Sequence, residues 1–183
     1  MAKIVGQKIK RYQSLGSTSD EAKRLVKEGE GEGLVVVAGE QTRGRGKPGS
    51  AWFSPPGGIY LSAVVKPFKN PDDLAPVTLL GAKAAVQTIR KAAGLAPEIK
   101  APNDVLVNAK KICGVLVERL ASGHLIIGIG LNVNLSATSL PEVINSSATS
   151  LFMETGKEHD VPGLTASLLQ ELDKEYLAYL SGI

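Results

Sequence analysis

Two cations and a tryptophan lie close together in a glycine-rich stretch from Gln41 to Trp52, which reads QTRGRGKPGSAW. Glycine residues can leave backbone N–H groups exposed in a concave anion-binding arrangement. The neighbouring cations add positive charge where phosphate oxygens would lie, and the tryptophan adds a flat face. We therefore interpret this stretch as a loop that binds an anionic group of a ligand next to a flat group. Its glycines and cations are Gly44, Gly46, Gly49, Arg43, Arg45 and Lys47.

Two other interpretations of this stretch compete with a binding loop. A P-loop requires a lysine followed by serine or threonine, but Lys47 is followed by Pro48, so a P-loop nucleotidase is not expected. A basic surface loop whose tryptophan simply enters the core is the commoner explanation for an isolated segment of this kind. Patterns elsewhere in the chain have to decide between this explanation and the binding loop.

The composition is typical of one globular domain. The chain has 183 residues, of which 43% are hydrophobic, and this is enough for a substantial core without a second folding unit. A net charge of +3 gives little indication of nucleic-acid binding. Cys113 is the single cysteine, and the N-terminus lacks a signal-peptide pattern. No apolar run approaches the roughly 18 residues that span a bilayer. We therefore expect a cytoplasmic protein that binds neither DNA nor membranes.

Hydrophobic periodicity predicts an α+β fold. Predicted strands cover residues 8–14, 34–39, 59–66, 98–101, 105–107, 112–120 and 125–135. Predicted helices cover residues 72–93, 148–154 and 162–180, together with one that is capped by residues 17–20 and ends near residue 28. Hairpin turns are expected at 108–110 and 122–123. The expected architecture is a mixed, largely antiparallel sheet with helices packed on one side.

The two faces of the strand from Leu125 to Asn134 differ in composition. The face expected in the core carries Leu125, Ile127, Ile129, Leu131 and Val133. The opposite face carries Gly128, Gly130, Asn132 and Asn134. Glycine inside a strand often marks the close approach of a ligand or of another backbone, so this face predicts a slot. A helix packed against the glycines explains the pattern equally well. The preceding strand begins with Lys111 and carries Gly114 and Glu118 on one side.

Four segments resemble, in order, the catalytic domain of the biotin protein ligases. Gly16–Ser19 is similar to the family's serine–threonine–asparagine motif, and Gln41–Trp52 resembles its glycine–arginine loop. Lys100–Asp104 resembles the KWPND motif, while Lys111–Gly114 and Gly128–Asn132 resemble two glycine-containing strands. The resemblance covers nearly the whole chain. It implies an enzyme that activates biotin with ATP to biotinyl-5'-AMP and transfers the biotin to a lysine of a biotin carboxyl carrier protein.

The resemblance also implies a role for each matched position. The implied biotin-binding residues are Ser17, Thr18, Gln41, Gly44, Arg45, Lys111, Gly114, Gly128 and Gly130. The implied nucleotide-binding residues are Arg45, Gly46, Lys47, Trp52, Asn103 and Asn132. The implied catalytic residues are Lys111, Arg45, Lys47 and Asp104. Because a carboxylate that attacks a phosphate brings two anions together, cations at these positions suit the chemistry, and Mg²⁺ is expected on the ATP phosphates.

The family's organisation carries further expectations. Residues 1–183 are expected to form a single catalytic domain, without an N-terminal helix-turn-helix domain and without the usual C-terminal SH3-like domain. A homodimer through a sheet edge within residues 105–135 is expected by analogy. Since the C-terminal domain helps to close over ATP and the carrier, one alternative is a module that binds biotin or biotinyl-adenylate but catalyses poorly. Lipoate or octanoate transfer is a lower-ranked alternative.

Several positions depart from the family's pattern. The residues Ser19, Ala101, Lys47, Ser50 and Cys113 replace Asn, Trp, Arg, Arg and Ala respectively. At position 47, lysine keeps the charge but loses the bidentate fork of arginine, which predicts weaker retention of the adenylate. A loop that orders over the adenylate would exclude water, so residues 43–50 are expected to be poorly ordered without ligand. Cys113 is expected to be buried, and His124 and His159 to be structural or exposed.

Overall fold

A seven-stranded sheet forms the centre of the protein in the computed structural model, which describes residues 2–47, 49–68 and 71–182. The order of the strands is β1-β2-β3-β7-β6-β5-β4. They are β1 (Lys8–Leu15), β2 (Leu34–Gln41), β3 (Ile59–Val65), β4 (Glu98–Lys100), β5 (Asp104–Val107), β6 (Lys110–Arg119) and β7 (Leu125–Leu131). β1 and β2 are parallel, and every other neighbouring pair is antiparallel. The predicted mixed, largely antiparallel sheet is confirmed.

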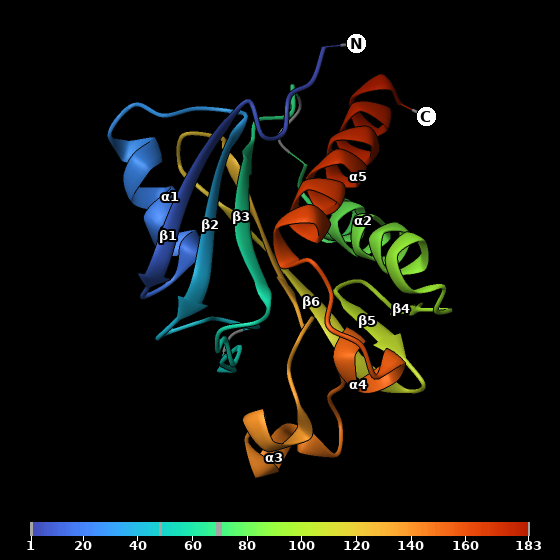
Figure 1. The fold of residues 1–183 in the computed structure, drawn as a ribbon. Coiled ribbons are helices and arrows are strands. Elements are labelled where there is room, and N and C mark those ends of the chain that lie inside the picture. Colours follow the sequence, from blue (N-terminus) through green and yellow to red (C-terminus); the bar gives the residue numbers. More distant parts are fainter. Residues whose placement is uncertain (1, 48, 69–70, 183) are drawn as a thin grey trace.

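Helices cover both faces of this sheet. They are α1 (Thr18–Lys27), α2 (Ala75–Ala93), α3 (Glu142–Asn145), α4 (Leu151–Thr155) and α5 (Val161–Ser181), with a 3₁₀ turn at Ala137–Ser139. α2 and α5 pack together against one face, whereas α1 lies on the other (Figure 1). The expectation that all helices lie on one side is therefore wrong for α1. The continuous apolar run of β2 explains this, because a strand buried on both faces needs a cover on each.

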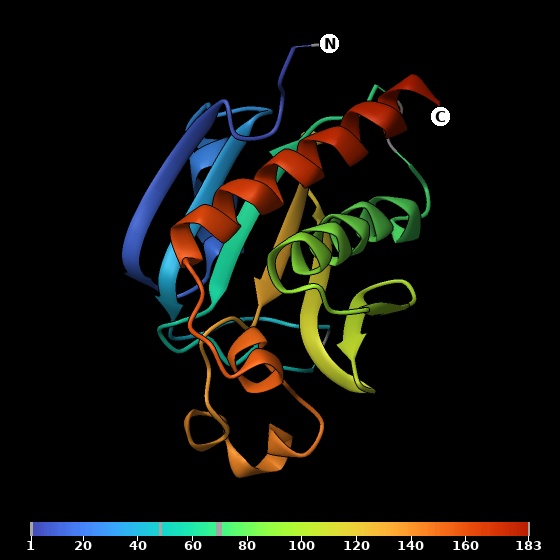
Figure 2. The ribbon, with the colours of Figure 1, turned by 45° about the vertical axis from the view of Figure 1, so that its right-hand side comes forward.

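The two faces of the sheet are sealed by separate apolar clusters. Alternate residues of β2 illustrate the division, since Val35 belongs to the large cluster under α2 and α5, while Leu34 and Val36 pack with Ala22 and Leu25 of α1. The turned view of Figure 2 shows α5 running diagonally across the sheet beside α2. The larger core and the α1 core together fix α1, and hence the residues at its N-terminus, relative to β6 and β7.

Most element boundaries follow the predicted caps and turns. Ser17 caps α1 by accepting a hydrogen bond from the backbone of Asp20, and α2 ends at Gly94 with a left-handed backbone, φ 64°. The β5–β6 turn has positive φ at Asn108 and Ala109, as a tight hairpin requires, and the β6–β7 turn contains Gly123.

Two predicted elements are shorter than expected. The strand predicted to reach residue 135 ends at Leu131, because the backbone oxygens of Asn132 and Val133 accept hydrogen bonds from Leu151 and Phe152 at the start of α4. The helix predicted from residue 148 begins at Leu151, where Ser150 caps it. The short helix α3 lies between these two elements and was not predicted. The chain between β7 and α4 leaves the sheet after Leu131 and returns to it at Ala148, which forms an isolated parallel bridge with Lys111 of β6.

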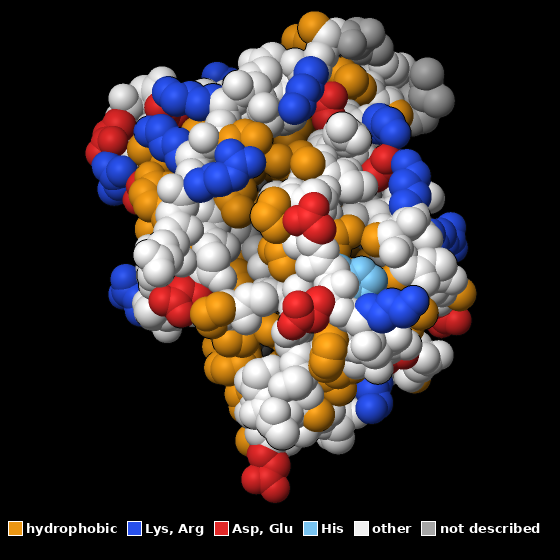
Figure 3. Space-filling model, in the orientation of Figure 1, with side chains coloured by type: hydrophobic (Ala, Val, Ile, Leu, Met, Phe, Trp, Pro, Cys, Tyr) orange, Lys and Arg blue, Asp and Glu red, His pale blue; other side chains and the backbone are white. Residues whose placement is uncertain are grey.

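The surface in Figure 3 carries basic and acidic side chains that are interspersed over the face shown. Large hydrophobic side chains that are exposed among the described residues include Phe53, Phe68 and Val143. None of the helices described is long and apolar enough to pass through a bilayer. The charge on this face is thus distributed in small clusters of both signs.

Candidate active site

A cavity of about 240 Å³ lies on the glycine face of β6 and β7. Its walls come from the start of α1, the loop between Gln41 and Phe53, and the chain around α3. Gly128 lies close to α1, since a Cβ there would be 3.1 Å from Ser19 Oγ. The two explanations of the glycine strand therefore both hold in part: the first turn of α1 packs at Gly128, and the cavity opens beside the remaining glycines.

The indole of Trp52 occupies the rest of the glycine slot. A Cβ at Gly130 would lie 2.3 Å from Trp52 Nε1, and a Cβ at Gly114 would lie 2.8 Å from Trp52 Cζ3. Only glycine at both positions permits this approach of the ring to the two strands. The Nε1 donor of Trp52 is buried, and no acceptor among the described residues bonds to it. The tryptophan is thus a wall of the cavity with an unused hydrogen-bond donor.

One end of the cavity is a cluster of buried polar groups. The amide oxygen of Gln41 accepts from the backbone N–H of Thr18 at 2.8 Å, and its amide nitrogen donates to Ser54 at 2.9 Å. The hydroxyl of Thr18 lies 2.8 Å from that of Ser62, which was not predicted as a site residue. Ser17 joins the cluster as the cap of α1. These hydroxyls and amides are held by one another, as a site for a compact polar head group requires.

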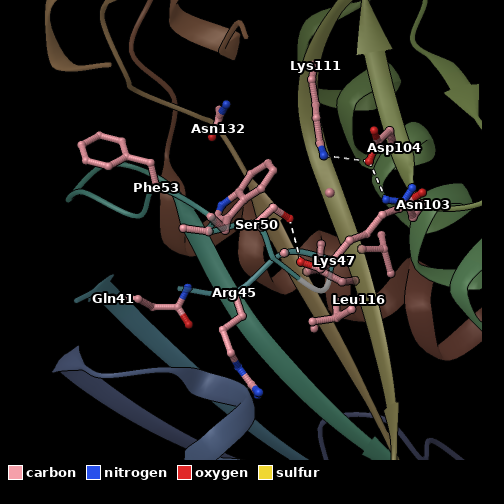
Figure 4. Close-up of a pocket in the computed structure, with 18 of the residues that line it drawn as sticks. Gln41, Arg45, Lys47, Ser50, Phe53, Asn103, Asp104, Lys111, Leu116 and Asn132 are labelled. Carbon is pink, nitrogen blue, oxygen red and sulfur yellow. Dashed lines mark hydrogen bonds and ion pairs between the residues drawn. The ribbon is translucent and has the colours of Figure 1, made fainter. Parts of the chain in front are cut away.

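The other end of the cavity carries an ion pair from the β5–β6 hairpin. Lys111 Nζ lies 2.8 Å from Asp104 Oδ1, and the same oxygen accepts from Asn103 Nδ2 at 2.7 Å (Figure 4). Lys111 Nζ also lies 5.2 Å from the ring centroid of Trp52, within the range of a cation–π contact. Asn132 donates to the backbone oxygen of Thr149 at 2.9 Å and so ties down the adjoining wall. The lysine is positioned by a single carboxylate.

The other two predicted cations differ from Lys111 in their surroundings. Arg45 Nη2 forms ion pairs with Asp20 at 2.9 Å and with Glu118 at 2.8 Å. In Figure 4 its guanidinium points away from Lys111. Lys47 is exposed, and none of the described carboxylates pairs with it. Arg45 therefore has two carboxylate partners, Lys111 has one, and Lys47 has none among the described residues.

All of the predicted site residues except Gly44 line the cavity. Gly44 is buried beneath the loop, where a Cβ would lie 2.3 Å from the backbone oxygen of Trp52, so it serves the packing of the loop. The lining residues that sequence reasoning missed include Phe53, Leu61, Leu116, Leu140, Ile144, Ser147 and Ala148. Leu140 and Ile144 lie on either side of Pro141 with a spacing of four residues, but one such pair is too little to show a helical periodicity.

The remaining candidate residues lie in other surroundings. Burial raises the pKa of the Cys113 thiol to about 12, so this cysteine is a poor nucleophile at neutral pH. His124 pairs with the hydroxyl of Ser122, and His159 with that of Thr155. The described part of the chain contains no group of three or more His, Cys, Asp or Glu side chains suited to a metal ion. Asp104 is the one carboxylate among the described lining residues.

Comparison with known proteins points to one family. A model of the biotin/lipoate A/B protein ligase family matches residues 11–134. The bifunctional ligase/repressor BirA of Bacillus subtilis (strain 168) is 37% identical over 183 aligned residues, which cover 97% of this chain and 56% of that protein. The biotin–[acetyl-CoA-carboxylase] ligase of Paracoccus denitrificans is 33% identical over 79% of this chain and 62% of that protein. The chain thus spans little more than half the length of these curated relatives.

A solved structure resembles the fold over almost the whole chain. The biotin protein ligase from Aquifex aeolicus in complex with biotin and ATP matches with a TM-score of 0.85 and 31% identity, covering 96% of this chain and 72% of that chain. The family match includes the β1–α1 turn, the glycine-rich loop and the hairpin that bears Lys111, and these are the segments that meet at the cavity. This chain belongs to the biotin/lipoate A/B protein ligase family.

Proposed function

We propose that this chain is a biotin protein ligase, which activates biotin with ATP to biotinyl-5'-AMP and transfers the biotin to a lysine of a biotin carboxyl carrier protein. The observation that carries the proposal is one cavity with a buried polar cluster at one end and Lys111 at the other, joined by glycine-backed walls. Relatives named as biotin ligases, and a similar structure that holds biotin and ATP, support this choice of substrates.

Biotin binding fits the shape and polarity of the cavity. The ureido ring needs both donors and acceptors, and the cluster of Ser17, Thr18 and Gln41 offers hydroxyl and amide groups that are already held in place. The apolar tail would pass along the face of β6 and β7 that carries Gly114, Gly128 and Gly130, against the Trp52 indole that lies over two of these glycines. Its carboxylate would then meet Lys111.

In the first step, an oxygen of the biotin carboxylate attacks the α-phosphorus of ATP. A new P–O bond forms as the bond to the β-phosphate oxygen breaks, and pyrophosphate leaves. Lys111 has three N–H donors and gives one to Asp104, so two are left for the carboxylate and the α-phosphate. Lys47 adds an uncompensated charge. Their role is to stabilise negative charge that increases in the transition state, and Mg²⁺ on the phosphates would add to it.

The nucleotide would lie on the side of the cavity that Trp52 and Asn132 border. The indole N–H has no acceptor among the described residues, and an acceptor on the adenylate would remove the cost of its burial. Asn103 and Asn132 would contribute indirectly, by fixing other parts of the site. Asn103 donates a hydrogen bond to Asp104, and Asn132 donates one to the backbone oxygen of Thr149 in the cavity wall.

In the second step, the amine of the carrier lysine attacks the acyl carbon of biotinyl-5'-AMP. The C–N bond forms, the C–O bond to AMP breaks, and the amine loses a proton. Asp104 is the carboxylate among the described lining residues, and in this proposal it orients the amine or accepts that proton. Its present partner, Lys111, would then keep its charge for the departing AMP.

The proposal is tested by incubating the purified chain with biotin, ATP and Mg²⁺ and measuring biotin-dependent pyrophosphate release. A biotin carrier domain is then added, and its mass is measured. Release with a mass gain on the carrier is the expected result. Biotin binding by calorimetry without pyrophosphate release would instead favour the binding module. Lipoate and octanoate in the same assay test the alternative acyl substrates, and a faster reaction with either would contradict the choice of biotin.

The homodimer is also a proposal. β6 pairs with β5 only as far as Gly114 but with β7 as far as Arg119, so residues 116–119 extend beyond β5. A second copy could align its own β6 there, as strand edges often do. Sedimentation at high micromolar concentration tests this, and a monomer under those conditions would contradict it.

A further inference from the structure

Arg45 belongs to a closed ring of four charged side chains. Its Nη2 lies 2.9 Å from Asp20 Oδ1 on α1 and 2.8 Å from Glu118 Oε2 on β6. Lys23, one turn further along α1, completes the ring: its Nζ lies 2.8 Å from Glu118 Oε1 and 3.7 Å from Asp20 Oδ1. Two cations and two carboxylates from three separate parts of the chain therefore neutralise one another. Neither the family resemblance nor the proposed mechanism assigns a role to Asp20, Lys23 or Glu118.

The ring connects the glycine-rich loop to the body of the protein. Arg45 and Ala51 form an isolated β-bridge, Gly46 donates to the backbone oxygen of Ser50 at 3.0 Å, and Trp52 donates to that of Gly44 at 2.9 Å. The loop is thus a small hairpin with two side-chain anchors. Trp52 anchors the returning arm in the glycine slot, and Arg45 anchors the outgoing arm to α1 and β6.

The ring also orients the guanidinium. The two carboxylates share Nη2, whereas Nε of Arg45 is buried and has no acceptor among the described residues. Arg45 lines the cavity, so a phosphate or carboxylate oxygen is the kind of acceptor that would satisfy this donor. Glu118 receives one bond on each oxygen, from Arg45 and from Lys23. Removing the charge of Glu118 would leave Arg45 with Asp20 alone, whose side chain is 51% exposed.

We propose that Glu118, with Asp20 and Lys23, is a positioning residue that fixes Arg45 and thereby holds the glycine-rich loop over the cavity and retains the adenylate beneath it. The holding of the loop follows from the ring alone. Retention of an adenylate rests on the proposed function. In this view Arg45 acts first as a tether, and Lys111 and Lys47 are the cations that meet the reacting groups.

The first test measures backbone hydrogen exchange in the loop of the unliganded protein. Glu118→Gln keeps the size of the side chain and removes its charge. The amides of Gly46 and Trp52 should exchange about two- to five-fold faster, the range expected for losing a partly exposed ion pair. Glu171→Gln is the matched control, because Glu171 also bridges two lysines, Lys91 at 2.7 Å and Lys174 at 2.9 Å, but lies outside the cavity lining. Unchanged loop exchange in Glu118→Gln, or equal acceleration in both variants, would overturn the proposal.

The second test measures retention of the intermediate. Single-turnover pyrophosphate release should change less than two-fold or so in Glu118→Gln, while free biotinyl-5'-AMP should appear in solution about two- to five-fold faster. In an Arg45→Met background, Glu118→Gln should add nothing further, because the partner is gone. Equal leakage from wild type and Glu118→Gln would refute the retention role. If the wild-type chain makes no adenylate, the ligase proposal fails, and the exchange measurement still decides whether the ring holds the loop.

Discussion

Arg45 and Lys111, the two cations of the cavity lining that form ion pairs, are equally exposed but differently held. The side chains of Arg45 and Lys111 are each 35% exposed, so burial does not distinguish them. Lys111 pairs with one carboxylate from the neighbouring strand, whereas Arg45 pairs with two carboxylates from α1 and β6. Lys111 has one negative partner for its one positive charge, whereas two carboxylates face the single positive charge of Arg45, although its Nε still has no acceptor among the described residues. If Lys111 is the catalytic cation and Arg45 the tether, as we propose, the number of counter-charges is the structural difference between the two roles.

The largest expected effect is that of Lys111→Ala. Removing the cation proposed to stabilise the transition state should slow biotin-dependent pyrophosphate release about 100-fold or more. The unfolding midpoint should change little, because Lys111 is partly exposed and its ion pair is of the weakly stabilising kind. Pyrophosphate release at the wild-type rate would show that Lys111 is not the catalytic cation, and its contrast with Arg45 would then have no functional meaning.

Asp104→Asn separates the two steps at the same end. Adenylation should stay within a few-fold of wild type, because Lys111 keeps its charge, whereas transfer to the carrier should fall about tenfold through loss of a charge-assisted hydrogen bond to the amine. The measurement is the rate of each step with the isolated adenylate as the starting point for the second. Equal losses in both steps would show that Asp104 acts only by holding Lys111.

Gly130→Ala tests the wall between the two ends. The new Cβ would lie 2.3 Å from Trp52 Nε1, so the indole must move, and we expect ATP affinity to fall about tenfold, as overpacking by 1–3 kcal/mol predicts. Gly128→Ala is the matched control, since its Cβ would meet Ser19 Oγ at 3.1 Å and leave Trp52 in place. Titration calorimetry with ATP compares the two variants. Similar affinities in both would show that the position of Trp52 does not matter for the nucleotide.

Lys47→Arg is expected to have the smallest effect. Arginine restores a bidentate donor beside the proposed phosphate position, so leakage of biotinyl-5'-AMP should slow about two- to five-fold. Lys47 has no carboxylate partner among the described residues, so the change leaves the ring around Arg45 intact. A faster leak in this variant would mean that residue 47 does not contact the phosphate. Retention of the adenylate would then depend only on the ring of charged residues around Arg45.

Local patterns predicted much of this molecule. The alternation of Gly128 and Gly130 with buried residues placed the cavity face correctly, because side-chain direction in a strand depends only on parity. The caps at Ser17 and Gly94 correctly predicted one end each of α1 and α2, because a cap depends only on residues a few positions away in the sequence.

Long-range partners could not be read from the sequence in this way. Glu118 shares its side of β6 with Gly114, but its partner Arg45 is 73 positions away in the sequence, and no local rule selects it. The same limit explains the missed cavity wall around α3, whose residues have no periodicity and whose neighbours Ser147 and Thr149 bond to the backbone of Lys111 in β6. α1 was placed on the wrong face because its side depends on which face of β2 is left uncovered by α2 and α5.

The position of the single tryptophan has a practical consequence. Trp52 lies in the glycine slot, next to the Lys111 ammonium, and the sequence contains no other indole. Light absorbed at the red edge of the protein spectrum therefore excites only this ring, and its emission reports on the electric field and solvent inside the cavity. The fluorescence of Trp52 can therefore report, without any added label, whether the proposed ligands biotin, ATP and the adenylate bind in the cavity.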